Sequence, residues 1–352
     1  MTDLLALTGE LCAIPSVSLD ETAMADAIEA RLRSTAGALE VERVGDNVVA
    51  RTMTGAARRV LLGGHLDTVP ANGNEQPRVE GDTLHGLGAA DMKGGLAVML
   101  HLAAVAAERV PRHDATFVFY EAEEVAEEHN GLRRLFAERP DLVETDLAIL
   151  LEPTGGWLEA GCQGSITVRA EFDGVRAHSA RSWTGVNAIH RASDLIARVS
   201  EHAADTVEVD GLAYREAFQV VRIEGGVANN VVPDRCAVVL NRRFAPVCTL
   251  DEAVAEVRSW CGDADRIEVL NASAAAPPNL FDPLIAELTG VYNLPVRAKL
   301  GWTDVARFAA AGTPACNLGP GDPELAHTAG EAVDRADLDG CAAVLGSFLG
   351  LT

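Results

Sequence analysis

The residues Val60-Leu-Leu-Gly-Gly-His65-Leu-Asp67-Thr-Val-Pro70 form an apolar run that ends abruptly in polar side chains. This pattern predicts a buried strand that delivers His65 and Asp67 at its carboxyl end. Because residues two apart lie on the same face of a strand, both side chains point the same way. A ligating imidazole commonly donates its second N–H to an acceptor, so the pair suits a metal ligand with a supporting carboxylate. A hydrogen-bonded histidine that only closes a strand is the alternative.

The stretch continues as Leu84-His-Gly-Leu-Gly-Ala-Ala-Asp91-Met-Lys-Gly-Gly95 and leads into a helix-forming segment over 93–107. Asp91 therefore lies at or just before a helix N-terminus, where it could cap the helix or bind a metal. The spacing of Gly86 and Gly88 resembles a dinucleotide-binding fingerprint, but Asp91 replaces the third glycine. The segment also lies far from the first strand of a βαβ unit, so we set that interpretation aside.

Composition and charge describe a folded protein with an acidic surface. The chain has 352 residues, of which 48% are hydrophobic and 23% charged. This length favours two domains. The formal net charge of −23 argues against binding to a nucleic-acid backbone or an anionic membrane. An anionic substrate would need a local cationic pocket.

Cysteine usage and the chain start predict a cytoplasmic protein. The seven cysteines are scattered without a C-x-x-C pair, which favours reduced thiols over a disulfide framework. The first residues predict a helix and not a signal peptide. No uninterrupted apolar run reaches the roughly 20 residues that span a membrane.

Strands and helices alternate along most of the chain. Strands are expected at 41–52, 59–64, 116–120, 146–151 and 315–318, and helices at 3–11, 21–34, 93–107, 131–138, 283–292, 304–311 and 335–349. This alternation predicts an α/β fold whose site lies beyond the carboxyl ends of the strands. Between these elements, strands at 165–172, 218–223, 235–244 and 266–271 and helices at 184–203 and 250–261 predict an inserted α+β domain.

Five groups of polar residues lie at the ends of the predicted strands or on the last loop: His65, Asp91, the pair Glu123-Glu124, Glu152 and His327. Each has an ordinary interpretation, for example a solvated acidic face for the glutamate pair. Imidazoles and carboxylates without thiolates suit zinc or a similar divalent ion. Two histidines and three carboxylates are too many for one catalytic ion and about right for two ions that share a bridging carboxylate. One glutamate of the pair would then bind metal and the other would move protons.

Eight motifs resemble the di-zinc aminoacylase and carboxypeptidase clan, and most closely its actinobacterial succinyl-diaminopimelate desuccinylases. They are Gly64-His-Leu-Asp-Thr-Val-Pro70, Gly86-Leu-Gly-Ala-Ala-Asp-Met-Lys93, Glu123-Glu124, Leu151-Glu-Pro-Thr154, Gly161-Cys-Gln-Gly164, Gly174-Val-Arg-Ala-His-Ser179, Asn229-Asn-Val-Val-Pro-Asp234 and Gly319-Pro-Gly-Asp322. The resemblance covers essentially the whole chain.

The resemblance implies a three-layer α/β/α catalytic domain of residues 1–163 and 277–352, with a ferredoxin-like lid and dimerisation domain of residues 164–276. It implies two Zn²⁺ ions, with Co²⁺ or Mn²⁺ able to substitute, and a cis peptide after the bridging aspartate. The implied ligands are His65 and Glu152 for one ion, Glu124 and His327 for the other, and Asp91 between them.

The resemblance also implies roles for residues that do not bind metal. Asp67 would orient His65, Glu123 would be the general acid/base, and His178 would reach the partner subunit's site in a homodimer and stabilise the oxyanion. Arg243, Asn230 and Arg176 would bind the substrate, since an arginine fork suits a carboxylate.

The implied activity is removal of an N-acyl group, first of all N-succinyl, from an amino acid such as N-succinyl-L,L-diaminopimelate. Two departures from the desuccinylase pattern concern the substrate: the small residues Thr328-Ala-Gly330 after His327, and Arg242 in place of an aromatic residue. They leave open an acetylornithine deacetylase-like deacylase or a dipeptidase in another pathway. A catalytically silent binding paralogue is a third option, disfavoured by the complete set of ligands.

Overall fold

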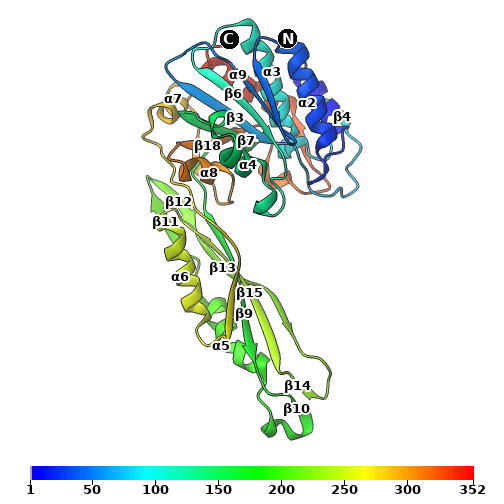
Figure 1. The fold of residues 1–352 in the computed structure, drawn as a ribbon, viewed down its shortest axis with the longest axis vertical. Helices are drawn as coiled ribbons and strands as arrows, with labels where there is room; N and C mark the ends of the chain where they lie inside the picture. Colours follow the sequence, from blue (N-terminus) through cyan, green and yellow to red (C-terminus); the bar gives the residue numbers. More distant parts are fainter. Residues whose placement is uncertain (1) are drawn as a thin grey trace. The chain divides into compact units, whose positions relative to one another are not determined.

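The computed structural model describes residues 2–352 and divides the chain into two compact units (Figure 1). The first comprises Met1–Ala160, Asn279–Arg297 and Arg307–Thr352, and the second comprises Gly161–Pro278 and Ala298–Ala306. Residues 298–306 differ from the expected division, which assigned them to the discontinuous domain. They group with the second unit because Gln163 N donates to Lys299 O at 3.2 Å and Trp302 Nε1 donates to Ala274 O at 3.2 Å.

An eight-stranded sheet forms the centre of the first unit, with strand order β1-β2-β6-β3-β7-β18-β8-β17. Its four middle strands, β6, β3, β7 and β18, pair in parallel, so their carboxyl ends meet at one edge. This confirms the predicted α/β class. The strands are β1 (Glu40–Val44), β2 (Asn47–Arg51), β3 (Arg59–His65), β6 (Asp114–Tyr120), β7 (Leu147–Pro153), β8 (Leu158–Ala160), β17 (Val296–Ala298) and β18 (Ala315–Gly319).

Helix α3 (Gly94–Glu108) is the core helix of this unit and packs against β3, β6 and β7. Around it lie α1 (Leu4–Cys12), α2 (Thr22–Thr35) and α9 (Arg335–Phe348). Ala89–Glu108 is the one helix among the described residues that is long and apolar enough to cross a membrane, and 78% of its most apolar window is buried inside the protein. A helix that is apolar all round is explained by such burial. The remaining helices are α4 (Gly131–Glu138), α7 (Pro283–Val291) and α8 (Val305–Ala310), with short turns η2 (Glu127–His129) and η3 (Pro140–Leu142).

The single strand predicted over 41–52 is wrong, because the structure contains a hairpin of β1 and β2. Gly45 has φ 63°, a left-handed conformation that glycine adopts without steric cost, and the chain reverses there. A three-stranded sheet of order β19-β5-β4 was also not predicted. Its strands, β4 (Arg78–Glu80), β5 (Thr83–His85) and β19 (Ala332–Asp334), are only three residues long.

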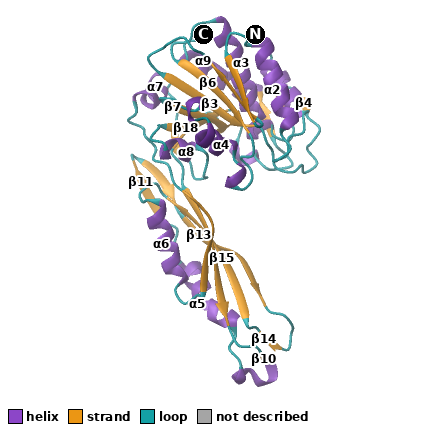
Figure 2. Cartoon of the chain, in the orientation of Figure 1, coloured by secondary structure: helices purple, strands orange, loops and turns teal. Residues whose placement is uncertain are grey.

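The second unit has the predicted ferredoxin-like arrangement. Its antiparallel sheet has the order β13-β15-β9-β16, and Figure 2 shows both of its helices along the same side of these strands. The elements are β9 (Gly164–Asp173), α5 (Ala188–Glu201), β13 (Ala217–Gly225), β15 (Arg235–Phe244), α6 (Leu250–Cys261) and β16 (Arg266–Ser273). Thr249 and Glu252 form a capping box that begins α6.

Alternate residues of β9, which include Val168 and Phe172, form one apolar core with α5 and α6. Two short ladders complete this unit, β10 (Ala177–His178) with β14 (Val231–Val232) and β11 (Thr206–Val209) with β12 (Leu212–Arg215). A turn η4 (Ser179–Thr184) follows β10.

Candidate metal centre

Three of the predicted site residues are delivered by neighbouring parallel strands. His65 is the last residue of β3, Glu152 is the penultimate residue of β7, and Glu124 follows β6. Because these strands are adjacent and parallel, their carboxyl ends bring the side chains together at one edge of the sheet. The sheet topology therefore explains how residues far apart in the sequence can serve one site.

Asp91 lies between the two histidines of the predicted site. It belongs to η1 (Ala89–Lys93), and the peptide bond from Asp91 to Met92 is cis, as predicted. Its Oδ1 lies 3.0 Å from His65 Nε2, and its Oδ2 lies 3.4 Å from His327 Nε2. Each carboxylate oxygen thus faces a different imidazole, which is the arrangement a bridging ligand requires.

His327 and Glu124 form the other side of the cluster, with His327 Nε2 at 2.7 Å from Glu124 Oε1. His327 lies in the loop after η5 (Pro323–Leu325) and has φ 61°. Two groups of potential ligand atoms share Asp91: one with His65 and Glu152, the other with Glu124 and His327, and in each group all atoms lie within 4.8 Å of one another. These donors, all imidazole or carboxylate, fit a divalent ion such as zinc.

Glu123 is near the same centre. It can group with His65 and Glu124 within the same 4.8 Å limit, but it is absent from both groups that contain Asp91. Glu124, in contrast, belongs to a group with Asp91 and His327. The neighbouring glutamates therefore have different surroundings, as expected if one binds metal and the other handles protons.

Asp67 is fully buried and organises the loop after β6 as well as His65. Its two carboxylate oxygens accept hydrogen bonds from the backbone N–H groups of Glu123 and Glu124, each at 3.0 Å. His65 Nδ1 lies 2.9 Å from the backbone oxygen of Asp67 and 3.5 Å from its Oδ1. The nearer acceptor for the imidazole is thus the backbone oxygen. The Asp67 carboxylate chiefly holds the backbone of the loop that carries Glu123 and Glu124.

Close packing of these charges shifts their protonation. The hydrogen bond to Asp91 raises the pKa of His327 to about 9. Burial alone would lower the pKa of His65, but its bonds to Asp67 and Asp91 raise that pKa well above the usual range. Burial raises the pKa of the Glu124 carboxyl. A divalent cation bound by these groups would compete with such protons.

Two supporting residues, Ser18 and Glu21, were missed in the sequence. Ser18 Oγ donates to Asp67 Oδ2 at 2.8 Å, and Glu21 Oε1 accepts from Ala122 N at 3.2 Å, just before the glutamate pair. Ala122 has φ 57°, and Glu21 is buried. The spacing Ser18-x-x-Glu21 before a helix is a detectable signal, but it is more often a helix-capping motif.

His178, Asn230 and Arg176 lie together in the second unit, around the ladder of β10 and β14. All three are exposed, and Ser179 N donates to Asn230 O at 2.9 Å. His178 Nδ1 accepts a hydrogen bond from Ala180 N at 3.1 Å. The proton of a neutral ring is therefore on Nε2, which can donate outward.

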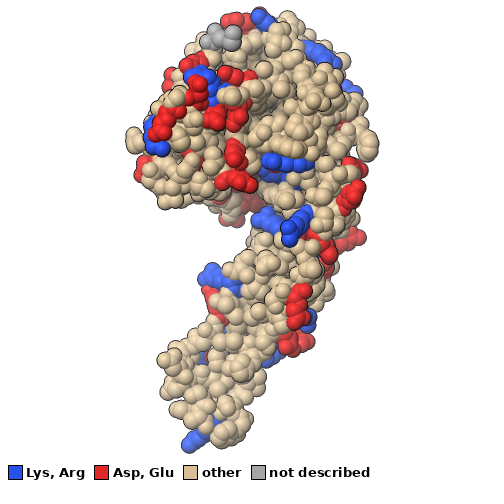
Figure 3. Space-filling model, turned by 180° about the vertical axis from the view of Figure 1, so that it is seen from behind, with Lys and Arg blue, Asp and Glu red and all other residues tan. Residues whose placement is uncertain are grey.

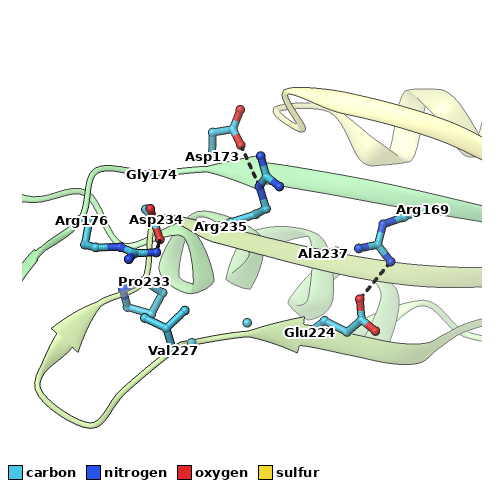
Figure 4. Close-up of a pocket in the computed structure, with 12 residues that line it drawn as sticks. Arg169, Asp173, Gly174, Arg176, Glu224, Val227, Pro233, Asp234, Arg235 and Ala237 are labelled. Carbon is cyan, nitrogen blue, oxygen red and sulfur yellow. Dashed lines mark hydrogen bonds and ion pairs between the residues drawn. The ribbon is translucent and has the colours of Figure 1, made fainter.

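Arg176 borders a pocket of about 690 Å³ in this unit, which Figure 4 shows in close-up. Its guanidinium forms an ion pair with Asp234 at 2.8 Å, and two further arginines of the pocket also face acidic residues. The pocket is therefore charge-balanced.

The neighbouring arginines of β15 have different environments. Arg242 is buried and bonds to Glu216 Oε2 at 2.5 Å. Arg243 is half-buried, burial lowers its pKa, and its Nε donates to Asn241 Oδ1 at 3.2 Å. Arg242, which departs from the desuccinylase pattern, thus has a structural partner inside its own unit.

The parallel sheet and the cluster of imidazoles and carboxylates at its strand ends fit a site for a divalent metal ion. The profile of peptidase family M20/M25/M40 matches residues 61–350, and the chain belongs to this family, which makes it a metal-dependent hydrolase of amide bonds. The resemblance stated from the sequence motifs is thereby confirmed. Membership implies that the protein binds a divalent metal.

Two relatives with more specific names match this chain over nearly its full length. The chain is 48% identical over 349 residues to the protein DapE of Mycobacterium tuberculosis, covering 99% of this chain and 98% of that protein. It is 46% identical over 354 residues to the succinyl-diaminopimelate desuccinylase of Corynebacterium glutamicum, covering 99% of this chain and 96% of the relative.

Among solved structures, a tripeptidase from Staphylococcus aureus matches with a TM-score of 0.82 at 21% identity, covering 99% of this chain and 97% of that one. An M20 family metallo-carboxypeptidase from Sulfolobus solfataricus matches with a TM-score of 0.79 at 16% identity, covering 100% of this chain and 99% of the other. At these identities the likeness shows the fold alone.

Proposed function

We propose that this chain hydrolyses N-succinyl-L,L-diaminopimelate to succinate and L,L-diaminopimelate. The observation that carries this proposal is the 46% identity, over nearly the whole length, to a relative named for that activity. The clustered ligands around Asp91 support a catalytic and not a silent protein.

The proposed metal content is two Zn²⁺ ions per subunit, with Co²⁺ or Mn²⁺ able to substitute. His65 and Glu152 would hold one ion, Glu124 and His327 the other, and Asp91 both. The two separate groups of donors that share Asp91 support this assignment. When bound, such ions polarise the scissile carbonyl and acidify the attacking water.

Glu123 is the general base and acid of the proposed mechanism. It accepts a proton from the water that attacks the amide carbonyl, and it later delivers that proton to the leaving amine nitrogen. Asp67 holds the Glu123 backbone through a 3.0 Å hydrogen bond, which fixes the start of this side chain beside the ligands. The role requires a glutamate near the centre that lies outside the two groups sharing Asp91, and Glu123 meets this description.

His178 donates from Nε2 to the oxyanion of the tetrahedral intermediate in the site of a second copy. The hydrogen bond from Ala180 N to Nδ1 supports the required tautomer. A preorganised donor of this kind commonly contributes about 3–4 kcal/mol to transition-state stabilisation.

A homodimer through the second unit is part of the proposal. The second unit bears exposed apolar side chains, among them Val175, Trp183, Val221 and Ile223. Among the described strands β13 has only one neighbour in its sheet, so its outer edge is available for pairing. These features fit a second copy of the same chain.

The proposed substrate is a dicarboxylate, and Arg243, Asn230 and Arg176 are its proposed binding residues. Arg243 is the strongest of them, since its guanidinium bonds to the neutral Asn241 side chain, whereas Arg176 already pairs with the Asp234 carboxylate. A bidentate arginine would recognise a substrate carboxylate.

The proposed setting is the cytoplasm, without nucleic-acid or membrane partners. All seven cysteines, which lie within the described residues, are free, as expected for a reducing compartment. On the face drawn in Figure 3, acidic and basic side chains are interspersed, and the net charge is −23. Such a surface does not favour polyanions.

The test is hydrolysis of N-succinyl-L,L-diaminopimelate by zinc-loaded protein, followed as loss of amide absorbance. Robust turnover, abolished by a chelator and restored by Zn²⁺, is expected. N-acetylornithine serves as the parallel substrate, because the small exposed residues Thr328 to Gly330 beside His327 could admit another acyl amino acid. Preference for N-acetylornithine would retain the chemistry and replace the substrate.

A further inference from the structure

Glu331 is a buried carboxylate close to the metal centre that the proposed mechanism does not use. It is 2% exposed and follows His327 by four residues. Its Oε1 accepts hydrogen bonds from Asp91 N at 3.0 Å and Ala90 N at 3.1 Å, and its Oε2 accepts from Gly88 N at 3.0 Å. Three backbone N–H groups of the loop that carries Asp91 therefore converge on one side chain.

Only a carboxylate satisfies this set of donors. Burial of the charge raises the pKa of Glu331, while the three N–H groups and the nearby ammonium of Lys93 favour the ionised form. A glutamine at this position would offer one oxygen, and its NH₂ group would face a backbone N–H, donor against donor. The charge therefore serves to hold the Gly88–Asp91 backbone.

The same segment holds the loop of His327. The backbone oxygen of Glu331 accepts from Gly86 N at 3.1 Å. Asn74 adds a second connection, because its Nδ2 donates to Thr328 O at 3.2 Å and its backbone oxygen accepts from Leu87 N at 2.9 Å. The loops that carry Asp91 and His327 are thus joined at Thr328 as well as at Glu331.

We propose that Glu331 is a positioning residue for the metal centre, which fixes the shared ligand Asp91 and the ligand His327 relative to each other. The inference rests on the proposed metal site. Asp91 must present one oxygen to His65 at 3.0 Å and the other toward His327 at 3.4 Å, so a small rotation of its backbone would misalign both. Loss of the Glu331 charge therefore weakens binding at both ions.

The test compares Zn²⁺ affinity in metal-stripped protein, measured by competition with a chromophoric chelator. Glu331→Gln is expected to lower the affinity for both equivalents about 10- to 100-fold, the usual cost of losing a group that orients ligands. Glu324→Gln is the matched control, because Glu324 is exposed in the same loop region and its change should leave the affinity intact. Hydrogen exchange at the amides of Gly88, Ala90 and Asp91 should become faster in Glu331→Gln alone.

Unchanged Zn²⁺ affinity in folded Glu331→Gln would overturn the positioning role, even if its melting temperature fell. If the unsubstituted protein bound no Zn²⁺, the proposed metal site itself would fail, which is a separate result. Should Glu331→Gln not fold, Glu331→Asp keeps the charge with a shorter reach. Glu331→Asp is also expected to bind Zn²⁺ more weakly than the unsubstituted protein. A Zn²⁺ affinity equal to that of the unsubstituted protein would contradict the inference.

Discussion

The strand-end centre of the first unit and the exposed loops around β10 and β14 in the second unit both carry predicted functional residues, yet they differ in physical character. In the first, His65 and Asp91 have side chains only 1% and 12% exposed, and they contact each other. In the second, His178, Asn230 and Arg176 are exposed and bond within their own unit. Buried charges are costly without a compensating partner, whereas exposed ones are not. The centre therefore suits a cation that compensates its carboxylates, whereas the proposed role of the exposed loops requires a second copy.

The largest effect is expected from Glu123→Gln in the centre. Removing the general base should lower kcat by about 10²–10⁴-fold, because the water must lose its proton unaided. Zn²⁺ content should stay at the level of the unsubstituted protein, since Glu123 is not a proposed ligand. Steady-state kinetic assays measure kcat, and metal analysis of the same preparation measures the Zn²⁺ content. Activity near the unsubstituted level would assign the proton transfer to another group.

His178→Ala should have the next largest effect and tests whether the exposed loops act on a second copy. Loss of one oxyanion donor is expected to lower kcat about 10²–10³-fold without loss of metal. Mixing this variant with Glu123→Gln should restore activity to about a quarter of normal, since about half of the dimers would be mixed and each would have one complete site.

Refolding the two variants together and assaying at equal total protein provides the measurement, and each variant refolded alone is the control. No recovery in a mixture shown to contain mixed dimers would mean that His178 acts, if at all, within its own subunit.

The smallest effects on turnover are expected from the neighbouring arginines of β15. Arg242→Met should leave KM and kcat nearly unchanged but destabilise the protein by about 3–5 kcal/mol, because it leaves the buried Glu216 carboxylate without its partner. Arg243→Lys should preserve the melting temperature and raise KM, since the fork that binds a carboxylate is lost. Melting curves and steady-state kinetics separate the two, and a reversed pattern would exchange their roles.

The residues of the centre could be predicted from the sequence because their signals are local and repeated. His65 is the last residue of β3, Glu152 is the penultimate residue of β7, and Glu124 follows β6. An open sheet has one edge where the carboxyl ends of its parallel strands meet. This rule groups His65, Glu124 and Glu152. The helix start adds Asp91, the last loop adds His327, and the family resemblance then implies the role of each ligand. The inserted α+β domain followed from the order of its strands and helices, and the resemblance implied its ferredoxin-like arrangement.

What the sequence could not show depends on backbone geometry and on tertiary contacts. The hairpin at Gly45 is signalled by one glycine inside an otherwise regular strand pattern. Glu331 and Glu21 bind backbone N–H groups 241 and 101 residues away, and no local pattern specifies such partners. The grouping of residues 298–306 with the second unit likewise depends on long-range hydrogen bonds.

One cluster around Asp91 is proposed to hold two metal ions. Titration of metal-stripped protein with Zn²⁺, followed by calorimetry, tests it most directly, with Asp91→Ala measured in parallel. We expect the unsubstituted protein to bind two tight equivalents of Zn²⁺ per chain and the variant to lose tight binding of both. A single equivalent, or a variant that retains both, would contradict the shared site.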